Sequence, residues 1–400
     1  MPAAATNSAI SVVLPCLNEA EAVSDSVKSA RLGIERSQRP GEVIVVDNGS
    51  TDDSARLACE AGARVVFEPR PGYGSALRRG FAEAQGDFIV MADADSTYDL
   101  AGLADLVARL DDGYDLAIGN RMANIHPGAM PWLHRHVGTP TISWLLRRTW
   151  GVSIRDSQSG FRALTRAALG GLQLRSTGME FASEMIIKSA VQGLRVAEVP
   201  SSYGLRAGGS KLRTLRDGWR HLRLILLLAP GLLYALPGAA LVVLGVLTFV
   251  IGFSFTSVEV GGLSWQPIFA GPIFWILGVT GLALGLTEHR RLVGIGLARP
   301  SKTLGLGYPL MRLEVSLVVA ALAVLVGVGI DAYIFVRWVS GAGPHPVGIQ
   351  LAALAQSLIV SGVNLAFIGF LGAGGATVSE QHHPSSLAMG GSPSKDQALR

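Results

Sequence analysis

After Arg223 the chain contains four long stretches with almost no charged residues. They lie at about 232–253, 269–286, 315–336 and 349–371. Each is close to the roughly 20 residues that an α-helix needs to cross a bilayer. Charged residues make up only 16% of the chain, against about 25% in soluble domains, and most of them lie before Arg223. We therefore expect a soluble domain followed by four transmembrane helices.

Lys and Arg indicate the orientation of these spans. The connector between the second and third spans contains Arg290, Arg291, Arg299, Lys302 and Arg312. The connectors at 254–265 and 340–348 contain neither residue type. Because basic loops stay in the cytoplasm, the soluble domain and both termini should be cytoplasmic. Residues 1–14 also lack the features of a signal peptide. These features predict a multi-pass protein of the cytoplasmic (plasma) membrane.

Four regions follow from this division. They are a cytoplasmic domain at 1–212, a juxtamembrane interfacial helix at 213–230, four transmembrane helices at 231–372 and a disordered tail at 373–400.

Basic residues cluster before the first span, which suits anionic headgroups or a lipid phosphate. They are Arg206, Lys211, Arg213, Arg216, Arg220 and Arg223. No nucleic-acid motif accompanies them, so no nucleic-acid partner is expected. A Trp/Arg-rich stretch at 132–150 favours either a helix on the membrane surface or an ordinary packed helix.

Within the cytoplasmic domain, apolar β-type runs alternate with helical segments. The expected strands lie at 10–14, 42–46, 64–67, 88–92 and 116–119. The expected helices lie at 19–32, 52–61, 75–84 and 100–110. Continuous apolar strands that alternate with helices predict an α/β fold with a mostly parallel, Rossmann-like sheet covered on both faces. Such sheets bind ligands at the carboxyl ends of their strands.

A pair of carboxylates follows the expected strand at 88–92. Asp93, Ala94 and Asp95 stand where this strand opens into a loop. Carboxylates at i and i+2 can face one divalent cation, and hard oxygen ligands suit Mg²⁺ or Mn²⁺, which would also hold a diphosphate. An isolated D-x-D is common in caps and turns, but its place after a buried strand favours a ligand site.

Two further strand ends present polar residues. Asp47 ends the second strand, where a carboxylate can accept hydrogen bonds from a base or a ribose. Pro15, Asn18 and Glu19 follow the first strand. Three polar strand ends at one edge of a parallel sheet predict a nucleotide site.

These segments closely resemble glycosyltransferase family 2, which has the A-type nucleotide-sugar fold. The matching segments are VVLPCLNE (12–19), VIVVDNGSTDD (43–53), FIVMADAD (88–95), RPGYGSAL (70–77), GNR (119–121), DSQSGFR (156–162) and RAGGSK (206–211). Together they resemble the polyprenyl-phosphate sugar synthases, such as dolichyl-phosphate mannose and glucose synthases. The resemblance covers about residues 10–222.

The resemblance implies roles for the matched residues. Nucleotide-sugar contacts would come from Pro15, Asn18, Glu19, Asp47, Asp93, Ala94 and Arg121. Asp93 and Asp95 would serve the metal and diphosphate, with Asp95 the direct ligand and a catalytic residue. Arg121, the second catalytic residue, would compensate phosphate charge. The acceptor phosphate would be drawn in by Arg162, Arg206, Ser210 and Lys211. Surface or ion-pair positions are the alternative for each of these side chains.

Two motifs of the wider family are absent. The chain has neither a T-E-D-type acidic base nor Q-x-x-R-W. A phosphate acceptor is already an anion at neutral pH and needs no general base. We therefore expect direct, inverting attack of polyprenyl phosphate on the sugar of a nucleotide-sugar. Thr97 departs from the pattern, because mannose-type relatives often have Gln there.

The sequence leaves the identity of the sugar donor and some alternative functions open. UDP-glucose is the expected donor, while GDP-mannose, a UDP-N-acetylhexosamine or a uronic-acid donor fits the same motifs. A hydroxyl acceptor, or a non-catalytic membrane scaffold or carrier, is the alternative function. The product would serve a cell-envelope glycan, and the chain is compatible with a homo-oligomer. Glu180 and Glu184 could contact sugar or lie on a helix surface. Asp331 should lie near the outer end of the third span.

Overall fold

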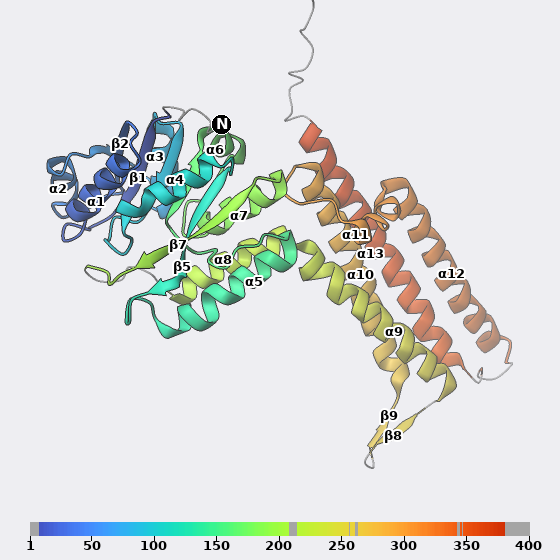
Figure 1. Ribbon diagram of the computed structural model, residues 1–400. Coiled ribbons are helices and arrows are strands. Elements are labelled where there is room, and N and C mark those ends of the chain that lie inside the picture. The colour runs from blue at the N-terminus through green and yellow to red at the C-terminus, as the bar shows by residue number, and fades with distance from the viewer. Residues whose placement is uncertain are drawn as a thin grey trace, which may run out of the picture. The chain divides into compact units, whose positions relative to one another are not determined.

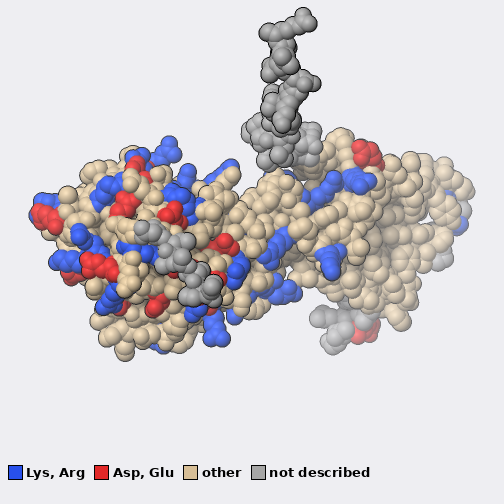
Figure 2. All heavy atoms as spheres, turned by 45° about the horizontal axis from the view of Figure 1, so that its top comes forward, with Lys and Arg blue, Asp and Glu red and all other residues tan. Residues whose placement is uncertain are grey.

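A computed structural model describes residues 8–207, 214–255, 257–260, 263–341, 345 and 347–380 (Figure 1). The chain divides into two compact units, Met1–Ala229 and Pro230–Arg400. Charged side chains are spread over the surface of the first unit, whereas the second shows mostly uncharged surface (Figure 2). This contrast follows the distribution of charge along the sequence.

The first unit is built on a seven-stranded sheet. In order across the sheet, its strands are β3 (Arg64–Phe67), β2 (Gly41–Asp47), β1 (Ile10–Cys16), β4 (Phe88–Met91), β6 (Arg162–Thr165), β5 (Leu116–Ile125) and β7 (Val196–Tyr203). All neighbours are parallel except β6, which runs antiparallel to both β4 and β5. The predicted α/β fold with a mostly parallel sheet is confirmed. Strands β6 and β7 are additions that the apolar pattern did not indicate.

Helices cover both faces of this sheet (Figure 1). The helices of the first unit are α1 (Val23–Arg36), α2 (Ser54–Glu60), α3 (Tyr73–Glu83), α4 (Leu103–Asp111), α5 (Thr139–Trp150), α6 (Arg166–Leu172), α7 (Phe181–Gln192) and α8 (Thr214–Leu228). Of these, α5 and α8 pack against α7 and against each other. Val12 and Leu14 of β1 share a core with Val27 of α1 and Leu103 of α4. The other face approaches α3, where only a glycine fits at position 80: a Cβ there would lie 2.3 Å from Val13 Cγ1. Burial on both faces explains why these strands are apolar throughout.

The second unit contains four helices that are long and apolar enough to cross a membrane. They are α9 (Leu236–Ser254), α10 (Ala270–Gly294), α12 (Leu313–Val339) and α13 (Gly348–Glu380). The prediction of four spans is confirmed at this level. A hairpin of β8 (Val258–Val260) and β9 (Leu263–Trp265) joins α9 to α10. The short α11 (Lys302–Gly305) lies between α10 and α12.

Small residues let α9 and α10 approach closely. A Cβ on Gly238 would lie 2.4 Å from the Leu282 nitrogen, and one on Gly278 would lie 2.5 Å from the Val242 nitrogen. Lipid chains are as apolar as leucine, so spans associate through close packing of this kind instead of the hydrophobic effect.

One detail of the second unit adds to the sequence-based expectations and another differs from them. Asp331 lies in the third span as expected, but its Oδ2 accepts a hydrogen bond of 2.8 Å from Gln356 Nε2 of α13. The tail predicted as disordered from 373 is helical as far as Glu380. Glycines at about 1 kcal/mol each do not end a helix that is already formed, and the first proline beyond the span is Pro384. Residues 381–400 lie outside the described part of the chain.

Candidate active site

The carboxyl ends of β1, β2 and β4 bring the predicted polar residues together at one edge of the sheet. Strand β1 pairs in parallel with both β2 and β4, with Cys16 opposite Asp47. Asp47 is buried, and its Oδ1 accepts a hydrogen bond of 3.2 Å from the Ser50 nitrogen. Asp93 and Asp95 follow β4 at the same edge.

Asn18 shapes the loop after β1. Its backbone has a φ of +51°, which is in the left-handed region. Asn is one of the residues that tolerate this conformation. Its Oδ1 accepts a hydrogen bond of 2.7 Å from the Thr51 nitrogen, and the Glu19 nitrogen donates to Ser54 Oγ at 2.7 Å. The loops after β1 and β2 are therefore joined before any ligand binds.

Asp93 and Asp95 have the properties of a cation site. Burial, together with the neighbouring negative charge of Asp95, raises the pKa of Asp93 to about 7, while a hydrogen bond from Tyr73 opposes the shift. A divalent cation would relieve this repulsion, so the two carboxylates fit Mg²⁺ or Mn²⁺. Among the described residues, no third carboxylate, histidine or cysteine joins Asp93 and Asp95 to form a group of three metal ligands. Other oxygen ligands, such as a diphosphate, would have to complete the coordination.

The loop that carries the DSQSGFR motif packs directly against Asp93. A Cβ at Gly160 would lie 2.8 Å from Asp93 Oδ2, so only glycine fits there without a shift. The Gly160 nitrogen donates to the Tyr98 hydroxyl at 2.8 Å. Tyr73, which hydrogen-bonds Asp93, and Tyr98, which holds the Gly160 loop, are residues of this site to which the sequence analysis gave no role.

Arg121 is held rigidly by a buried partner. Its Nε and Nη2 donate to the two oxygens of Asp156, each at 2.8 Å, and its backbone nitrogen donates to Oδ2 at 2.9 Å. The guanidinium also lies over the ring of Tyr203, at 5.2 Å from the ring centroid. Glu198 supports this arrangement, because its Oε1 accepts from the backbone nitrogens of residues 155 and 156. Asp156 and Glu198 thus orient an arginine that the sequence predicted as a phosphate ligand.

Arg162 does not have the predicted role. It is 0% exposed, and its guanidinium donates to the carbonyl oxygens of Ser157, Ser159 and Ala182, each at 2.9 Å. Burial lowers its pKa to about 10. A guanidinium with these backbone acceptors cannot reach an acceptor phosphate, so we correct this assignment. Arg162 fixes the loop before β6 and the start of α7.

Arg206 reaches back to the carboxylate edge. Its Nη2 pairs with Glu19 Oε1, and its Nη1 lies 3.2 Å from Asp95 Oδ2. Ser210 and Lys211, which were assigned with it to the acceptor, lie outside the described residues.

Glu180 and Glu184, whose roles the sequence left open, have different surroundings. Glu180 Oε1 accepts a hydrogen bond of 3.2 Å from the Gly178 nitrogen, while its buried Oε2 has no hydrogen-bond partner among the described residues. Glu184 accepts hydrogen bonds from the Arg175 and Ser176 nitrogens and pairs with Lys188 at 2.7 Å.

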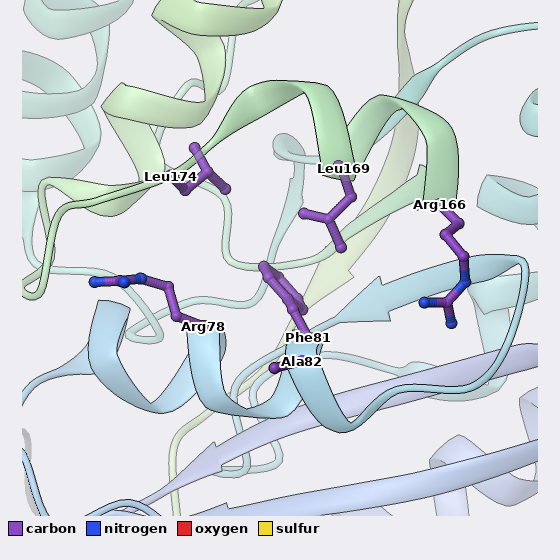
Figure 3. A pocket seen from close by; sticks show the side chains of 7 residues that line it. Arg78, Phe81, Ala82, Arg166, Leu169 and Leu174 are labelled. Atoms are coloured by element: carbon purple, nitrogen blue, oxygen red, sulfur yellow. The ribbon is translucent and has the colours of Figure 1, made fainter. Parts of the chain in front are cut away.

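A cavity of about 270 Å³ lies between α3 and α6 (Figure 3). Phe81 lies in its middle, with Arg78 and Arg166 toward its two ends. None of its lining residues belongs to the carboxylate edge.

Comparison with known proteins shows the family to which the chain belongs. Residues 11–172 match glycosyl transferase family 2, and residues 289–373 match the family 2 C-terminal transmembrane region. The low-salt glycan biosynthesis hexosyltransferase Agl6 of Haloferax volcanii is 35% identical over 367 residues, which are 90% of this chain and 88% of that protein. The chain belongs to glycosyltransferase family 2. It is a membrane glycosyltransferase that resembles the polyprenyl-phosphate hexose synthases.

Two further similarities concern this glycosyltransferase. The dolichyl-phosphate hexose transferase of H. volcanii is 32% identical over 213 residues, which are 52% of this chain and 89% of that protein. A crystal structure of glucosyl-3-phosphoglycerate synthase from Mycobacterium tuberculosis contains Mn²⁺, UDP-glucose and phosphoglyceric acid. It is 27% identical, covers 55% of this chain and 79% of that chain, and has a TM-score of 0.46.

Proposed function

We propose that this glycosyltransferase transfers a hexose from a nucleotide-sugar to polyprenyl phosphate at the cytoplasmic membrane face, with inversion at the anomeric carbon. UDP-glucose is the donor we favour. One observation carries the proposal: Asp47, Asp93 and Asp95 converge at one sheet edge in a chain that also has four candidate membrane spans. The names of the relatives, a hexosyltransferase and a dolichyl-phosphate hexose transferase, support the reaction class.

The nucleoside would lie against the loops after β1 and β2. Asp47 and Glu19 supply carboxylate acceptors for base and ribose donors, and Pro15 and Ala94 line the strand ends. Asn18 contributes by fixing the loop, since its side-chain oxygen already holds the Thr51 nitrogen. The site is thus shaped before the donor arrives, which lowers the cost of ordering it.

Asp93 and Asp95 would hold the Mg²⁺ or Mn²⁺. When bound, this cation neutralises charge on the diphosphate leaving group. Arg121 would add hydrogen-bond donors that are fixed by its two bonds to Asp156, whose negative charge offsets that of the guanidinium. Donors that need no reorganisation stabilise a developing charge most effectively.

The acceptor phosphate would attack without a general base. One of its oxygens is already anionic and forms a bond to the anomeric carbon while the bond to the diphosphate breaks, which inverts that carbon. Arg206, together with Ser210 and Lys211, would bind this phosphate. The task of the protein is therefore alignment and charge compensation.

The test is transfer from radiolabelled nucleotide-sugars to polyprenyl phosphate in membranes that contain the protein, with and without Mn²⁺ or Mg²⁺. We expect a metal-dependent lipid product from UDP-glucose. GDP-mannose, UDP-N-acetylhexosamine and uronic-acid donors belong in the same panel. The double variant Asp93→Ala plus Asp95→Ala should lose transfer while it still inserts into the membrane.

The matched control is Asp112→Ala, which removes an exposed carboxylate of the same domain. It should keep full transfer. If no donor gives a lipid product with folded protein, the acceptor is a hydroxyl or the protein is a non-catalytic scaffold, and the proposal is wrong.

A further inference from the structure

Arg206 joins two carboxylates that come from different strand ends. Its Nη2 pairs with Glu19, 187 residues away in sequence, and its Nη1 lies 3.2 Å from Asp95 Oδ2. The Arg206 side chain is 22% exposed, and those of Glu19 and Asp95 are 10% and 6% exposed. The three side chains form a mostly buried cation between two anions.

Thr97 limits the ways in which Asp95 can bind a cation. Its nitrogen and its hydroxyl both donate to Asp95 Oδ1, at 3.1 and 2.6 Å. The other oxygen, Oδ2, is the one that faces Arg206. A divalent cation at Asp95 therefore competes with Arg206 for the same oxygen. Thr97 therefore orients the Asp95 carboxylate so that the same oxygen faces Arg206 or a bound divalent cation.

The guanidinium is only partly satisfied in this position. Its Nε is buried and makes no hydrogen bond to any residue that the structure describes. A buried donor without an acceptor is unfavourable, and a phosphate is the acceptor that a guanidinium fork matches well. Arg206 would therefore gain a hydrogen bond on moving from the carboxylates to a phosphate.

We propose that Arg206 is an internal counter-cation of the empty donor site and is released to the acceptor phosphate when a divalent cation takes Asp95. This inference rests on the proposed function. It makes Arg206 a positioning residue that sets the order of binding: cation and donor first, lipid phosphate second. It also predicts reciprocal coupling. If a bound cation strengthens phosphate binding by a given factor, a bound phosphate that draws Arg206 away must strengthen cation binding by the same factor.

The first measurement is Mn²⁺ binding to the full-length protein in nanodiscs, without a nucleotide-sugar. The electron paramagnetic resonance signal of free Mn²⁺ reports how much of the ion is bound. Arg206→Gln removes the competing cation, so Mn²⁺ should bind more tightly by about tenfold, within the range known for coupled sites. Arg206→Lys keeps the charge and should bind Mn²⁺ nearly as the wild type does. Arg56→Gln, an exposed arginine that pairs with Asp53 and Glu60, is the matched control and should change nothing. Unchanged Mn²⁺ affinity in folded Arg206→Gln would overturn the proposal.

The second measurement separates displacement from a simple loss of positive charge. Farnesyl phosphate, a short isoprenyl phosphate, should tighten Mn²⁺ binding to the wild type and leave it unchanged in Arg206→Gln. If the tightening persists in the variant, phosphate acts on Mn²⁺ directly and the proposal is wrong.

Failure of the proposed function would look different. In that case the wild type would give no lipid product, whatever the behaviour of Mn²⁺. If transfer proceeds while Mn²⁺ binding is independent of Arg206, only the counter-cation proposal fails.

Discussion

Asp93 is a residue whose charge changes near neutral pH. Its pKa is raised from 3.8 to about 7, first by burial and then by Asp95. Between these two values the folded protein keeps a proton that the unfolded chain has lost. The free energy of unfolding of the metal-free protein should therefore fall as the pH rises from about 4 to 7. Thermal unfolding across this range, with a chelator present, measures the slope.

The variant Asp93→Asn removes the titrating group and keeps the shape of the side chain. It should be less sensitive to pH between 4 and 7 than the wild type. An equal slope in both proteins would show that other groups dominate, which contradicts the prediction.

Arg162 should matter for stability and little for acceptor binding. Removing its guanidinium leaves three buried carbonyl oxygens without their donors. We expect Arg162→Leu to lose at least about 3 kcal/mol of unfolding free energy, the scale for a broken buried charged network. Thermal unfolding checks this, with the exposed Arg109→Leu as the control. A stable Arg162→Leu with a raised KM for polyprenyl phosphate would restore the original assignment.

Helix α5 tests the two interpretations of the Trp/Arg-rich stretch. Trp144 is 54% exposed, whereas Trp150 at the end of the same helix is 3% exposed. If α5 lies on the membrane, lipids brominated near the headgroup should quench Trp144 and spare Trp150. Trp144→Phe should then reduce the quenched fraction of the fluorescence, and Trp150→Phe should not. Equal effects would favour an ordinary packed helix.

The contact between α9 and α10 should tolerate no side chain at Gly278. A Cβ there would lie within 2.5 Å of the Val242 nitrogen, which belongs to the backbone and cannot turn aside. Gly278→Leu should therefore lower the melting temperature in detergent by several degrees, about what a loss of 1–3 kcal/mol produces. Gly329 of α12 has open space around it, so Gly329→Leu is the matched control. Equal melting temperatures would mean that the two helices do not meet as described.

The elements that the sequence predicted are those with continuous apolar runs. Strands β1, β2 and β4 are buried almost throughout, so their patterns stand out. Strand β6 could not be predicted in this way. It is short, begins with an arginine, and exists because β4 and β5 both pair with it. Its order in the sheet depends on tertiary pairing, which local propensity does not contain.

At the scale of the whole molecule, the orientation in the membrane is the first prediction to test. The β8–β9 hairpin should face outward, and the connector with Lys302 should face the cytoplasm. In a Cys59→Ser background, which removes the exposed native thiol, an impermeant maleimide should label Glu259→Cys in intact cells. Lys302→Cys should react only after lysis. The reverse pattern would invert the topology.

Contacts between distant segments account for what the sequence missed in the site. Strand ends could be placed at one edge because parallel topology alone puts them there. The pairing of Arg121 with Asp156 joins residues 35 apart, and that of Arg206 with Glu19 joins residues 187 apart. Neither pair has a local pattern, so the assignment of three arginines to phosphates could not be refined from sequence. In the structure Arg121 is fixed by Asp156, Arg162 is bound to backbone carbonyl oxygens, and Arg206 pairs with Glu19 and Asp95 at the carboxylate edge.

The antiparallel strand β6 divides the sheet into two halves of different chemistry. The loops after β1, β2 and β4 hold the carboxylates assigned to the donor, whereas Arg121 lies in β5 and Arg206 follows β7. Arg206 links the two halves, because it pairs with Glu19 and Asp95. A substitution at the carboxylate edge therefore also changes the surroundings of a residue assigned to the acceptor. Among the descendants of one ancestral enzyme, donor preference and acceptor preference should then diverge together and not as independently inherited traits.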